Sequence, residues 1–207
     1  MARIGILGGS FNPAHSAHRH ISLEAQRRLG LDRVWWLVSP QNPLKPRAGM
    51  APLAARLLRA REVARHPRIR VTALEQDLGT RYSADTAAAL RRRYPQHDFI
   101  FLMGADNLVQ FHRWKDWRAL ARTLPIAVMA RPSYIGAARR APAMGWLRRF
   151  VKKSEAARQW PEWSLPAIVF LRIPLDTLSA TAIRARDPEW ARRYLSTDED
   201  QRPLDRP

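Results

Sequence analysis

Cysteine is absent from the chain, and acidic residues are scarce in it. The 207 residues include 18 Asp and Glu but 36 Lys and Arg, which gives a formal net charge of +18. The lack of cysteine excludes disulfide bonds and thiol catalysis. The excess of positive charge attracts phosphates and other polyanions, so nucleotides and nucleic acids are both candidate partners.

Long apolar runs are also missing. No stretch approaches the roughly 20 apolar residues that a membrane-spanning helix needs, so we expect no membrane partner. Residues 1–3 lead directly into a predicted strand and not into a secretory signal, so the expected compartment is the cytoplasm. The hydrophobic content of 46% is normal for a globular chain with a substantial core.

Predicted strands and helices alternate along the chain. The strands are expected at 3–8, 33–39, 69–73, 98–103, 125–130 and 167–172, and the helices at 16–29, 52–65, 83–93, 106–121 and 179–186. Several strands are apolar throughout, which is typical of strands buried on both faces of a parallel sheet. We therefore predict an α/β fold with a doubly wound parallel sheet, whose ligands bind at the carboxyl ends of the strands.

A single domain is expected over residues 1–195. Residues 132–166 form a basic insert that breaks the alternation, with an amphipathic stretch at 146–153. The apolar residues of this stretch recur at i and i+4, which favours a helix packed on its own domain. A lid, a subunit contact and membrane-surface binding are alternatives. The polar residues 196–207 are expected to form a flexible tail. A monomer and a homodimer both fit the sequence.

A glycine turn and two histidines follow the first predicted strand. They consist of Gly8, Gly9, Ser10, Phe11, His15 and His18. Small residues before a helix start leave backbone N–H groups free to bind a phosphate. Three residues apart, the histidines point to one side of the helix and can donate hydrogen bonds to phosphoryl oxygens. The alternatives are a tight turn with a surface histidine pair, or half of a zinc site. Zinc lacks further ligands, because no cysteine is present and the other histidines are unsuitably spaced.

A second candidate phosphate site lies at the start of the last predicted helix. Ser179 and Thr181 can cap the helix or bind phosphate through their hydroxyls, and Arg184 can hold two phosphate oxygens with its planar guanidinium. In isolation, an ordinary capped helix with a solvated arginine is the simpler interpretation. Two such motifs, each at the start of a predicted helix, together indicate one phosphate site.

Residues in the middle of the chain are suited to a second substrate. Tyr82 and Ser83 open a predicted helix, and Gly104 and Asp106 follow a predicted strand, with Trp114 close behind. Asp106 is suited to bind a ribose or a hydrated metal, and Trp114 can stack on a flat ring. Each has a plainer interpretation, namely a helix cap for Ser83 and Asp106 and a core position for Trp114.

Both phosphate motifs resemble known signatures. The first is similar to the Gly-x-Phe-x-Pro-x-His-x-Gly-His signature of the nucleotidyltransferase superfamily with a Rossmann-like fold, through Gly9, Phe11, Pro13, His15 and His18. Ala17 stands where the signature has glycine, and its methyl group takes space near the phosphates. Residues 178–184 resemble the Ile-Ser-x-Thr-x-Ile-Arg signature of the same superfamily, with Leu178 in place of the isoleucine.

The middle of the chain narrows this resemblance. Tyr82-Ser83 and the set Gly104, Asp106 and Trp114 resemble the Tyr-Thr and Gly-x-Asp…Trp segments of the bacterial nicotinate mononucleotide adenylyltransferases. The resemblance implies adenylyl transfer from ATP to nicotinate mononucleotide, which gives nicotinate adenine dinucleotide and pyrophosphate in NAD biosynthesis. Relatives that act on nicotinamide mononucleotide or phosphopantetheine share the outer motifs, and these substrates are the alternatives.

The same resemblance implies a role for each motif residue. His15, His18 and Arg184 would be catalytic, and Tyr82, Ser83 and Trp114 would bind nicotinate mononucleotide. The ATP-binding residues would be Gly8, Gly9, Ser10, Phe11, His15, His18, Lys45, Gly104, Asp106, Ser179, Thr181 and Arg184. Lys45 serves equally well as a solvated loop lysine. Magnesium would be bound mainly through the ATP phosphates, so the protein itself is expected to have no metal site.

A basic nucleic-acid-binding protein is the alternative outside the enzymes. The arginines are spread along the chain in short runs such as 91–93, 139–140 and 148–149, and no recognisable DNA- or RNA-binding module surrounds them. Positive charge also suits an enzyme whose two substrates both carry phosphates. We therefore expect no specific nucleic-acid partner.

Overall fold

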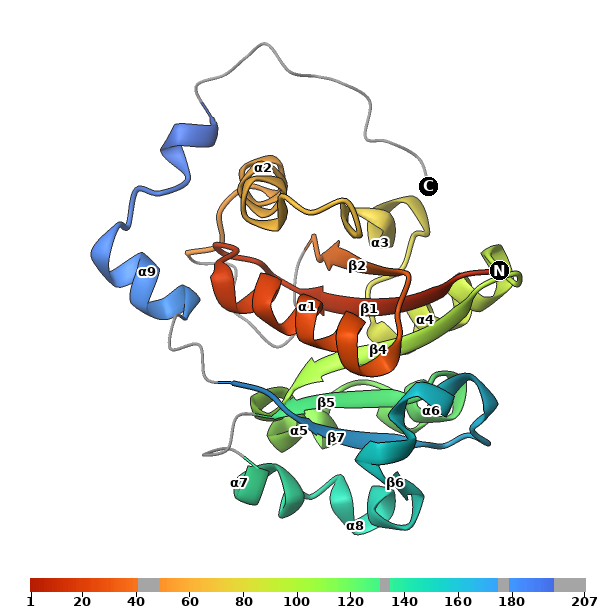
Figure 1. Ribbon diagram of the computed structural model, residues 1–207. Coiled ribbons are helices and arrows are strands. Elements are labelled where there is room, and N and C mark those ends of the chain that lie inside the picture. Colours follow the sequence, from red (N-terminus) through yellow and green to blue (C-terminus); the bar gives the residue numbers. More distant parts are fainter. Residues whose placement is uncertain (41–48, 131–134, 175–178, 196–207) are drawn as a thin grey trace.

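The computed structural model describes residues 1–40, 49–130, 135–174 and 179–195. Within these residues the chain forms a seven-stranded sheet in the order β3-β2-β1-β4-β5-β7-β6, and each neighbouring pair of strands is parallel (Figure 1). The strands are β1 (Arg3–Gly9), β2 (Arg33–Val38), β3 (Ile69–Thr72), β4 (Asp98–Gly104), β5 (Ile126–Ala130), β6 (Val151–Lys152) and β7 (Ile168–Arg172). The predicted doubly wound parallel fold is confirmed, and the six predicted strands are each found to within one residue at either end.

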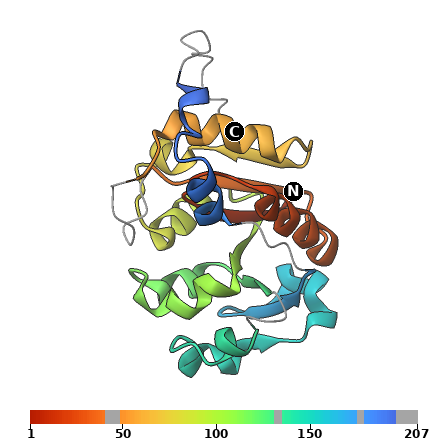
Figure 2. The same ribbon diagram turned by 90° about the vertical axis from the view of Figure 1, so that its left-hand side faces the viewer.

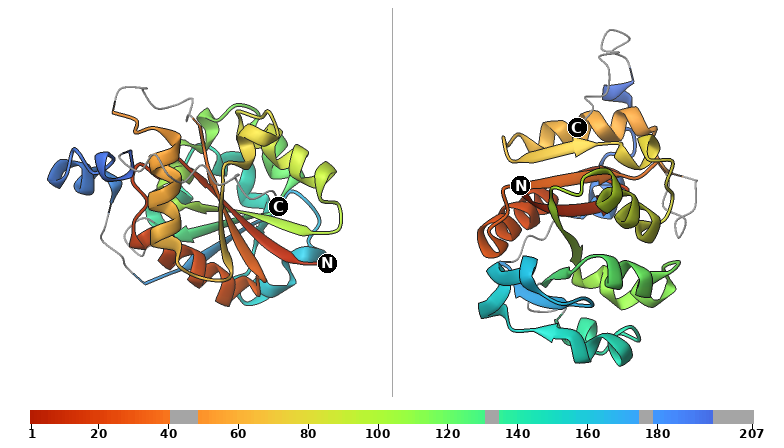
Figure 3. Two further views of the ribbon diagram at one scale, coloured as in Figure 1. Left: turned by 90° about the horizontal axis from the view of Figure 1, so that it is seen from above. Right: turned by 90° about the vertical axis from the view of Figure 1, so that its right-hand side faces the viewer.

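Helices cover both faces of the sheet (Figure 3). The α-helices are α1 (Ser16–Leu29), α2 (Leu53–Ala64), α3 (Leu74–Asp77), α4 (Ser83–Arg93), α5 (Ala105–Gln110), α6 (Trp117–Thr123), α7 (Ile135–Arg139), α8 (Met144–Leu147) and α9 (Ala180–Arg186). The 3-10 helices are η1 (Phe111–Arg113), η3 (Arg148–Phe150), η4 (Ser154–Glu162) and η5 (Arg192–Tyr194). One face packs against α1, α2 and η4, and the opposite face packs against α3 to α8.

Neighbouring residues of each strand point to opposite helix layers. Ile6 pairs with Phe101 and points toward α4, whereas Leu7 pairs with Leu102 and points toward α1. This alternation divides the core into two clusters, one on each side of the sheet. At Gly5, an added Cβ would lie 2.7 Å from a side-chain carbon of Leu31, so a larger residue would force the packed leucine side chains to shift.

The C-terminal part of the described chain returns to the N-terminal elements. Figure 2 shows α9 beside the start of α1 and η5 beside α2. Trp190 is buried, and the hydroxyl of Tyr194 donates a hydrogen bond to Glu62 of α2. Arg59 of α2 donates to the same hydroxyl. The last described elements are therefore attached to the half of the sheet that contains the glycine turn.

The helix predicted over 106–121 is wrong. The chain instead forms α5, η1 and α6, because Trp114 is extended and Asp116 has a φ of 51°, in the left-handed region that ends a helix. The aromatic residues Phe111, Trp114 and Trp117 still pack on one core. The three-residue spacing of these aromatic residues therefore does mark a shared core face, but the residues lie on either side of a turn between helices.

The helix predicted for the stretch 146–153 is also wrong. Only α8 and η3 form, and the chain then extends into β6, which pairs with β7 at the edge of the sheet. Leu147 is fully buried in the core and Val151 is exposed, so the apolar residues do not share one stripe. The described part of the expected insert therefore contributes a strand to the main sheet. The expected tail, 196–207, lies outside the described residues.

Candidate functional site

The loop after β1 has a strained backbone that is held by aromatic packing. It follows Gly8 and Gly9, at the carboxyl edge of the sheet. Phe11 has a φ of 46°, which costs a residue with a side chain about 1 kcal/mol or more. The Phe11 ring stacks on Trp36 with a centroid distance of 5.0 Å and lies 4.8 Å from the ring of His18. Phe11 therefore fixes both the loop and an imidazole.

The two histidines of the turn meet at the start of α1, as their spacing predicts. The ring centroids of His15 and His18 are 4.1 Å apart. The backbone N–H of His15 donates to Nδ1 of His18 at 3.2 Å. Because this nitrogen accepts a hydrogen bond, neutral His18 carries its proton on Nε2. The fold thus sets the tautomer of His18 so that Nε2 is the donor.

Arg56, to which the sequence analysis assigned no role, holds the loop in place from the protein interior. Its side chain is 1% exposed, and the guanidinium donates to the backbone carbonyls of Ser10 at 2.8 Å and Ser39 at 2.6 Å. It also donates to the carbonyls of Pro40 and Ala51, each at 2.9 Å. Burial lowers the pKa of this guanidinium. A buried positive charge therefore lies directly behind the loop, satisfied by carbonyl oxygens.

A sequence signal for Arg56 exists in hindsight. Arg56, Ala60 and Ala64 are spaced by four along α2 and all three are buried. An arginine on the apolar face of a helix needs acceptors inside the protein, and the nearest strand ends supply them. Helix periodicity alone could indicate that the arginine is buried, but it could not identify the carbonyls.

Asn12 joins the loop to the segment before α2. Its amide donates to the carbonyl of Gly49 at 2.8 Å and accepts from the backbone N–H of Ala51 at 3.2 Å. Asn12 lies inside the first signature, but sequence analysis gave it no role. The amide supplies both a donor and an acceptor, which is what the two backbone groups require.

Arg184 reaches the same loop from the far end of the chain. Its guanidinium donates to the backbone carbonyl of Asn12, a contact that spans 172 residues, and to the Thr181 hydroxyl at 3.4 Å. Ser179 caps α9, since its hydroxyl oxygen accepts from the Ala182 backbone N–H at 3.2 Å. The capping interpretation of Ser179 is confirmed. The two motifs that sequence analysis assigned to one phosphate site do come together.

The residues expected to bind the second substrate surround the start of α4. Tyr82 precedes this helix and Ser83 is its first residue. Ser83 lines a small cavity together with Gly8 and Phe101, and Phe101 contacts the ring of Trp114 edge-on at a centroid distance of 6.2 Å. Trp114 is half-buried and also packs on Phe111. The core interpretation of Trp114 is thus borne out in part, since the ring packs against the core and is not fully buried.

A lysine lies beside the same residues. The Nζ atom of Lys115 is 4.5 Å from the centroid of the Tyr82 ring, a cation–π contact. Lys115 is exposed, so its charge faces solvent at the start of α4. The amide groups of a helix N-terminus and an ammonium group together favour an anion at this position.

The remaining predicted residues have mixed outcomes. Asp106 is exposed, and its Oδ1 would lie 2.3 Å from a Cβ at position 104, so Gly104 provides the space for this carboxylate. Ala17 is 2% exposed, so its methyl group is buried in the protein. Lys45 and Leu178 lie outside the described residues. Within the described ranges, no group of three or more His, Cys, Asp and Glu side chains is arranged to hold a metal ion.

Comparison with known proteins agrees with this arrangement. A family model described as cytidylyltransferase-like matches residues 6–186, from the first strand to the last helix. The chain belongs to the cytidylyltransferase-like family. Membership in this family makes it a nucleotidyltransferase, and the alternative of a basic nucleic-acid-binding protein is not supported.

Individual relatives within the cytidylyltransferase-like family have more specific descriptions. The chain is 57% identical over 194 residues to a probable nicotinate-nucleotide adenylyltransferase of Erythrobacter litoralis, which covers 94% of this chain and 89% of the relative. It is 53% identical over 183 residues to a protein of the same description from Cereibacter sphaeroides, with 88% and 96% covered. These matches confirm the resemblance drawn from the motifs.

Solved structures support the fold. The nicotinic acid mononucleotide adenylyltransferase of Plasmodium falciparum complexed with NaAD superimposes with a TM-score of 0.64 at 16% identity, covering 97% of this chain and 87% of that one. The same enzyme complexed with APC gives a TM-score of 0.62, with 89% and 83% covered.

Among the residues that the structure describes, no helix is long and apolar enough to cross a membrane.

Proposed function

We propose that the protein transfers the adenylyl group of ATP to nicotinate mononucleotide and releases pyrophosphate. The observation that carries this proposal is the meeting of the His15–His18 pair and Arg184 on one loop at the carboxyl edge of a parallel sheet. The family and the names of its relatives support the same reaction.

The reaction requires alignment more than proton transfer. An oxygen of the nicotinate mononucleotide phosphate attacks the α-phosphorus of ATP, and a new P–O bond forms. The bond from the α-phosphorus to the bridging oxygen breaks, and pyrophosphate leaves with the electron pair. The attacking phosphate is already an anion, so catalysis depends on holding the two phosphates close and on stabilising the charge that develops.

In this proposal the β1–α1 loop and α9 bind the triphosphate. The Nε2–H of His18 donates to an oxygen of the transferred phosphoryl group, and His15 supports it. Arg184 approaches from the opposite side and exchanges its contact with the Asn12 carbonyl for phosphate oxygens. The buried charge of Arg56 adds a fixed positive potential behind the loop.

The acceptor is assigned to the start of α4. This helix has 11 residues, and its first N–H groups, at Tyr82 and Ser83, suit the carboxylate of nicotinate. Trp114 offers a ring face, and Lys115 adds positive charge beside Tyr82. Magnesium would neutralise the phosphates while bound mainly to their oxygens.

The test is to incubate the purified protein with ATP, magnesium and one acceptor at a time, and to measure pyrophosphate. We expect rapid release with nicotinate mononucleotide, and much slower release with nicotinamide mononucleotide or phosphopantetheine. A protein that carries His18→Ala serves as the matched control for contaminating activity. Faster release with either alternative acceptor would reassign the substrate, and release with none would overturn the proposal.

A further inference from the structure

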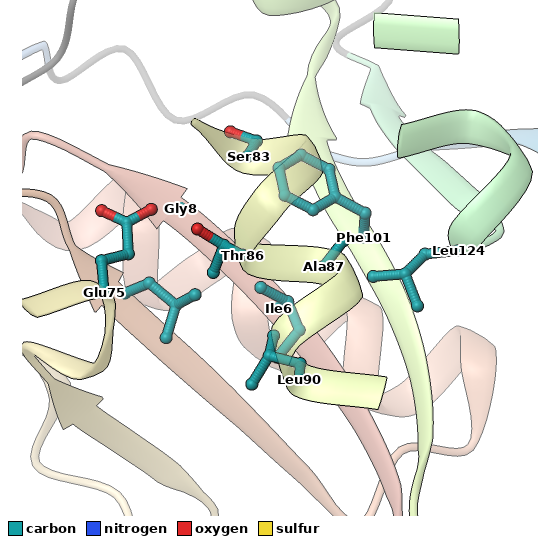
Figure 4. Close-up of a pocket in the computed structure, with 10 residues that line it drawn as sticks. Ile6, Gly8, Glu75, Ser83, Thr86, Ala87, Leu90, Phe101 and Leu124 are labelled. Atoms are coloured by element: carbon teal, nitrogen blue, oxygen red, sulfur yellow. The ribbon is translucent and has the colours of Figure 1, made fainter. Parts of the chain in front are cut away.

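Glu75 is a buried carboxyl that the reaction scheme does not use. It lies on α3, just after β3, and is only 7% exposed. The carboxyl lines a cavity of about 10 Å³ whose wall includes Gly8, Ser83 and Thr86. Figure 4 shows the carboxyl group of Glu75 and the hydroxyl of Thr86 directed toward each other across this cavity. The cavity is too small for a pyridine ring, so Glu75 acts through its protein contacts.

Two hydroxyls hold this carboxyl from two different elements. Ser39, which follows β2, and Thr86, in the first turns of α4, both donate hydrogen bonds to Glu75. The other oxygen, Oε2, has no hydrogen-bond partner among the described atoms. Burial raises the pKa of Glu75 to about 7. Keeping such a group in the interior costs free energy that its hydrogen bonds only partly offset.

The contacts continue from Glu75 to both substrate regions. On one side, the backbone N–H of Ser39 donates to the carbonyl of Gly9 at 2.9 Å, which reaches the phosphate loop. On the other side, the Thr86 hydroxyl shares its one proton between Glu75 and the carbonyl of Tyr82 at 3.2 Å, and it lies 2.9 Å from the Thr80 hydroxyl. Glu75 is therefore the link between the end of β1 and the start of α4.

We propose that Glu75 is a positioning residue for the acceptor, which holds the first turn of α4 at a fixed distance from the loop that binds ATP. This inference rests on the proposed function, because it assumes that the acceptor binds at Tyr82 and Ser83. In-line attack requires reacting atoms about 3–3.5 Å apart, and a misplacement of about 1 Å is costly in rate. A rigid link between the two binding segments meets this requirement.

The test compares Glu75→Ala and Glu75→Gln with Gln76→Ala, an exposed neighbour on the same helix, as the control. We expect Glu75→Ala to raise the KM for nicotinate mononucleotide by about tenfold or more while the KM for ATP changes by less than about twofold. Glu75→Gln keeps an oxygen that accepts from Ser39 or Thr86, so it should restore most of the acceptor affinity. Thr86→Val removes one donor with little change of shape, and it should repeat the alanine effect if Glu75→Ala does not fold.

Hydrogen exchange at the backbone amides of residues 82–86 gives a second readout that needs no substrate. Glu75→Ala and Thr86→Val should speed exchange there and leave the amides of α1 unchanged. Unchanged acceptor KM and unchanged exchange in a folded variant would overturn the inference, as would a fall in kcat alone that follows the folded fraction. If the unaltered protein releases no pyrophosphate, the proposed function fails, and the exchange data still decide whether Glu75 holds α4.

Discussion

The two proposed substrate regions are built in different ways. Around the β1–α1 loop, the packing of Phe11 on Trp36 is joined by hydrogen bonds from buried or half-buried polar side chains, and Arg56, Asn12 and Arg184 all satisfy backbone groups. Around the start of α4, the contacts are mostly edge-on aromatic packing, with Trp114 on Phe101, and a single buried carboxyl. The first region fixes positions for charged phosphates, and the second offers an apolar surface that can accept a ring.

This difference suggests where rate and selectivity reside. Hydrogen-bond donors held in place need no rearrangement as charge develops, so the first region should control turnover. Ring contacts and a helix N-terminus distinguish one acceptor from another, so the second region should control affinity and choice. Variants in each region can separate the two contributions.

The largest effect is expected from His18→Ala. Loss of the Nε2–H donor should lower kcat by about two to four orders of magnitude with an intact fold. His15→Ala should act in the same direction but less severely. Steady-state kinetics and circular dichroism measure both, with His20→Ala, two residues further along α1, as the control. A His18→Ala protein that keeps most of its turnover would contradict the division of roles.

The next largest effect is expected from Arg56→Ala, which should lower the free energy of unfolding. Four backbone carbonyls lose their donor, and leaving buried acceptors unsatisfied costs about 1–3 kcal/mol each, so a total loss of about 4 kcal/mol or more is expected. Urea denaturation measures the loss. Arg61→Ala, at an exposed position of the same helix, should change stability by less than about 0.5 kcal/mol. Equal effects at the two positions would show that the anchor contributes nothing.

The raised pKa of Glu75 should make the stability of the protein depend on pH. Its folded pKa, raised from 4.5 to about 7 chiefly by burial, means that the folded protein binds more protons than the unfolded chain between these values. The contribution of this group to the free energy of unfolding is therefore fully present below about pH 4.5. It falls by about 3 kcal/mol as the pH rises through 7. Glu75→Gln should remove this loss, seen as a growing relative stability of the variant from pH 4 to 8. A constant difference between the two proteins would mean that the carboxyl titrates normally.

The smallest effect concerns acceptor choice. A carboxamide places its own N–H group against the donors at Tyr82 and Ser83, so catalytic efficiency should be at least about tenfold higher with nicotinate than with nicotinamide mononucleotide. Trp114→Ala should lower acceptor affinity and leave the KM for ATP unchanged, whereas Trp163→Ala, in the core on the other face of the sheet, should alter neither. Equal efficiencies for acid and amide would remove the proposed basis of selectivity.

Much of the fold could be predicted because buried parallel strands leave a plain signal. The run 98–103 is almost wholly apolar, and β4 forms there with helices on both faces. The break at Asp116 could not be predicted, since Phe111, Trp114 and Trp117 keep a helix-like spacing across it. Packing on a common core preserved the spacing while the backbone turned.

The candidate site was predictable where its chemistry is local. The spacing of His15, which caps α1 from outside, and His18, in its first turn, brought their rings together at the helix start. Arg56 and Glu75 were not predicted, because their partners are carbonyls and hydroxyls that the fold delivers from distant positions. Arginine and glutamate in helices are usually solvated, and only the tertiary structure shows that these two are not.

The contact of Arg184 with the carbonyl of Asn12 has a consequence for how the protein is made. Translation proceeds from the N-terminus at about 5–20 residues per second, so the 172 residues between these partners take at least about nine seconds to synthesise. During that interval the nascent chain can form β1, the glycine turn and the paired histidines without its arginine. A nascent chain that has not yet reached Arg184 therefore carries an incomplete copy of the proposed triphosphate site.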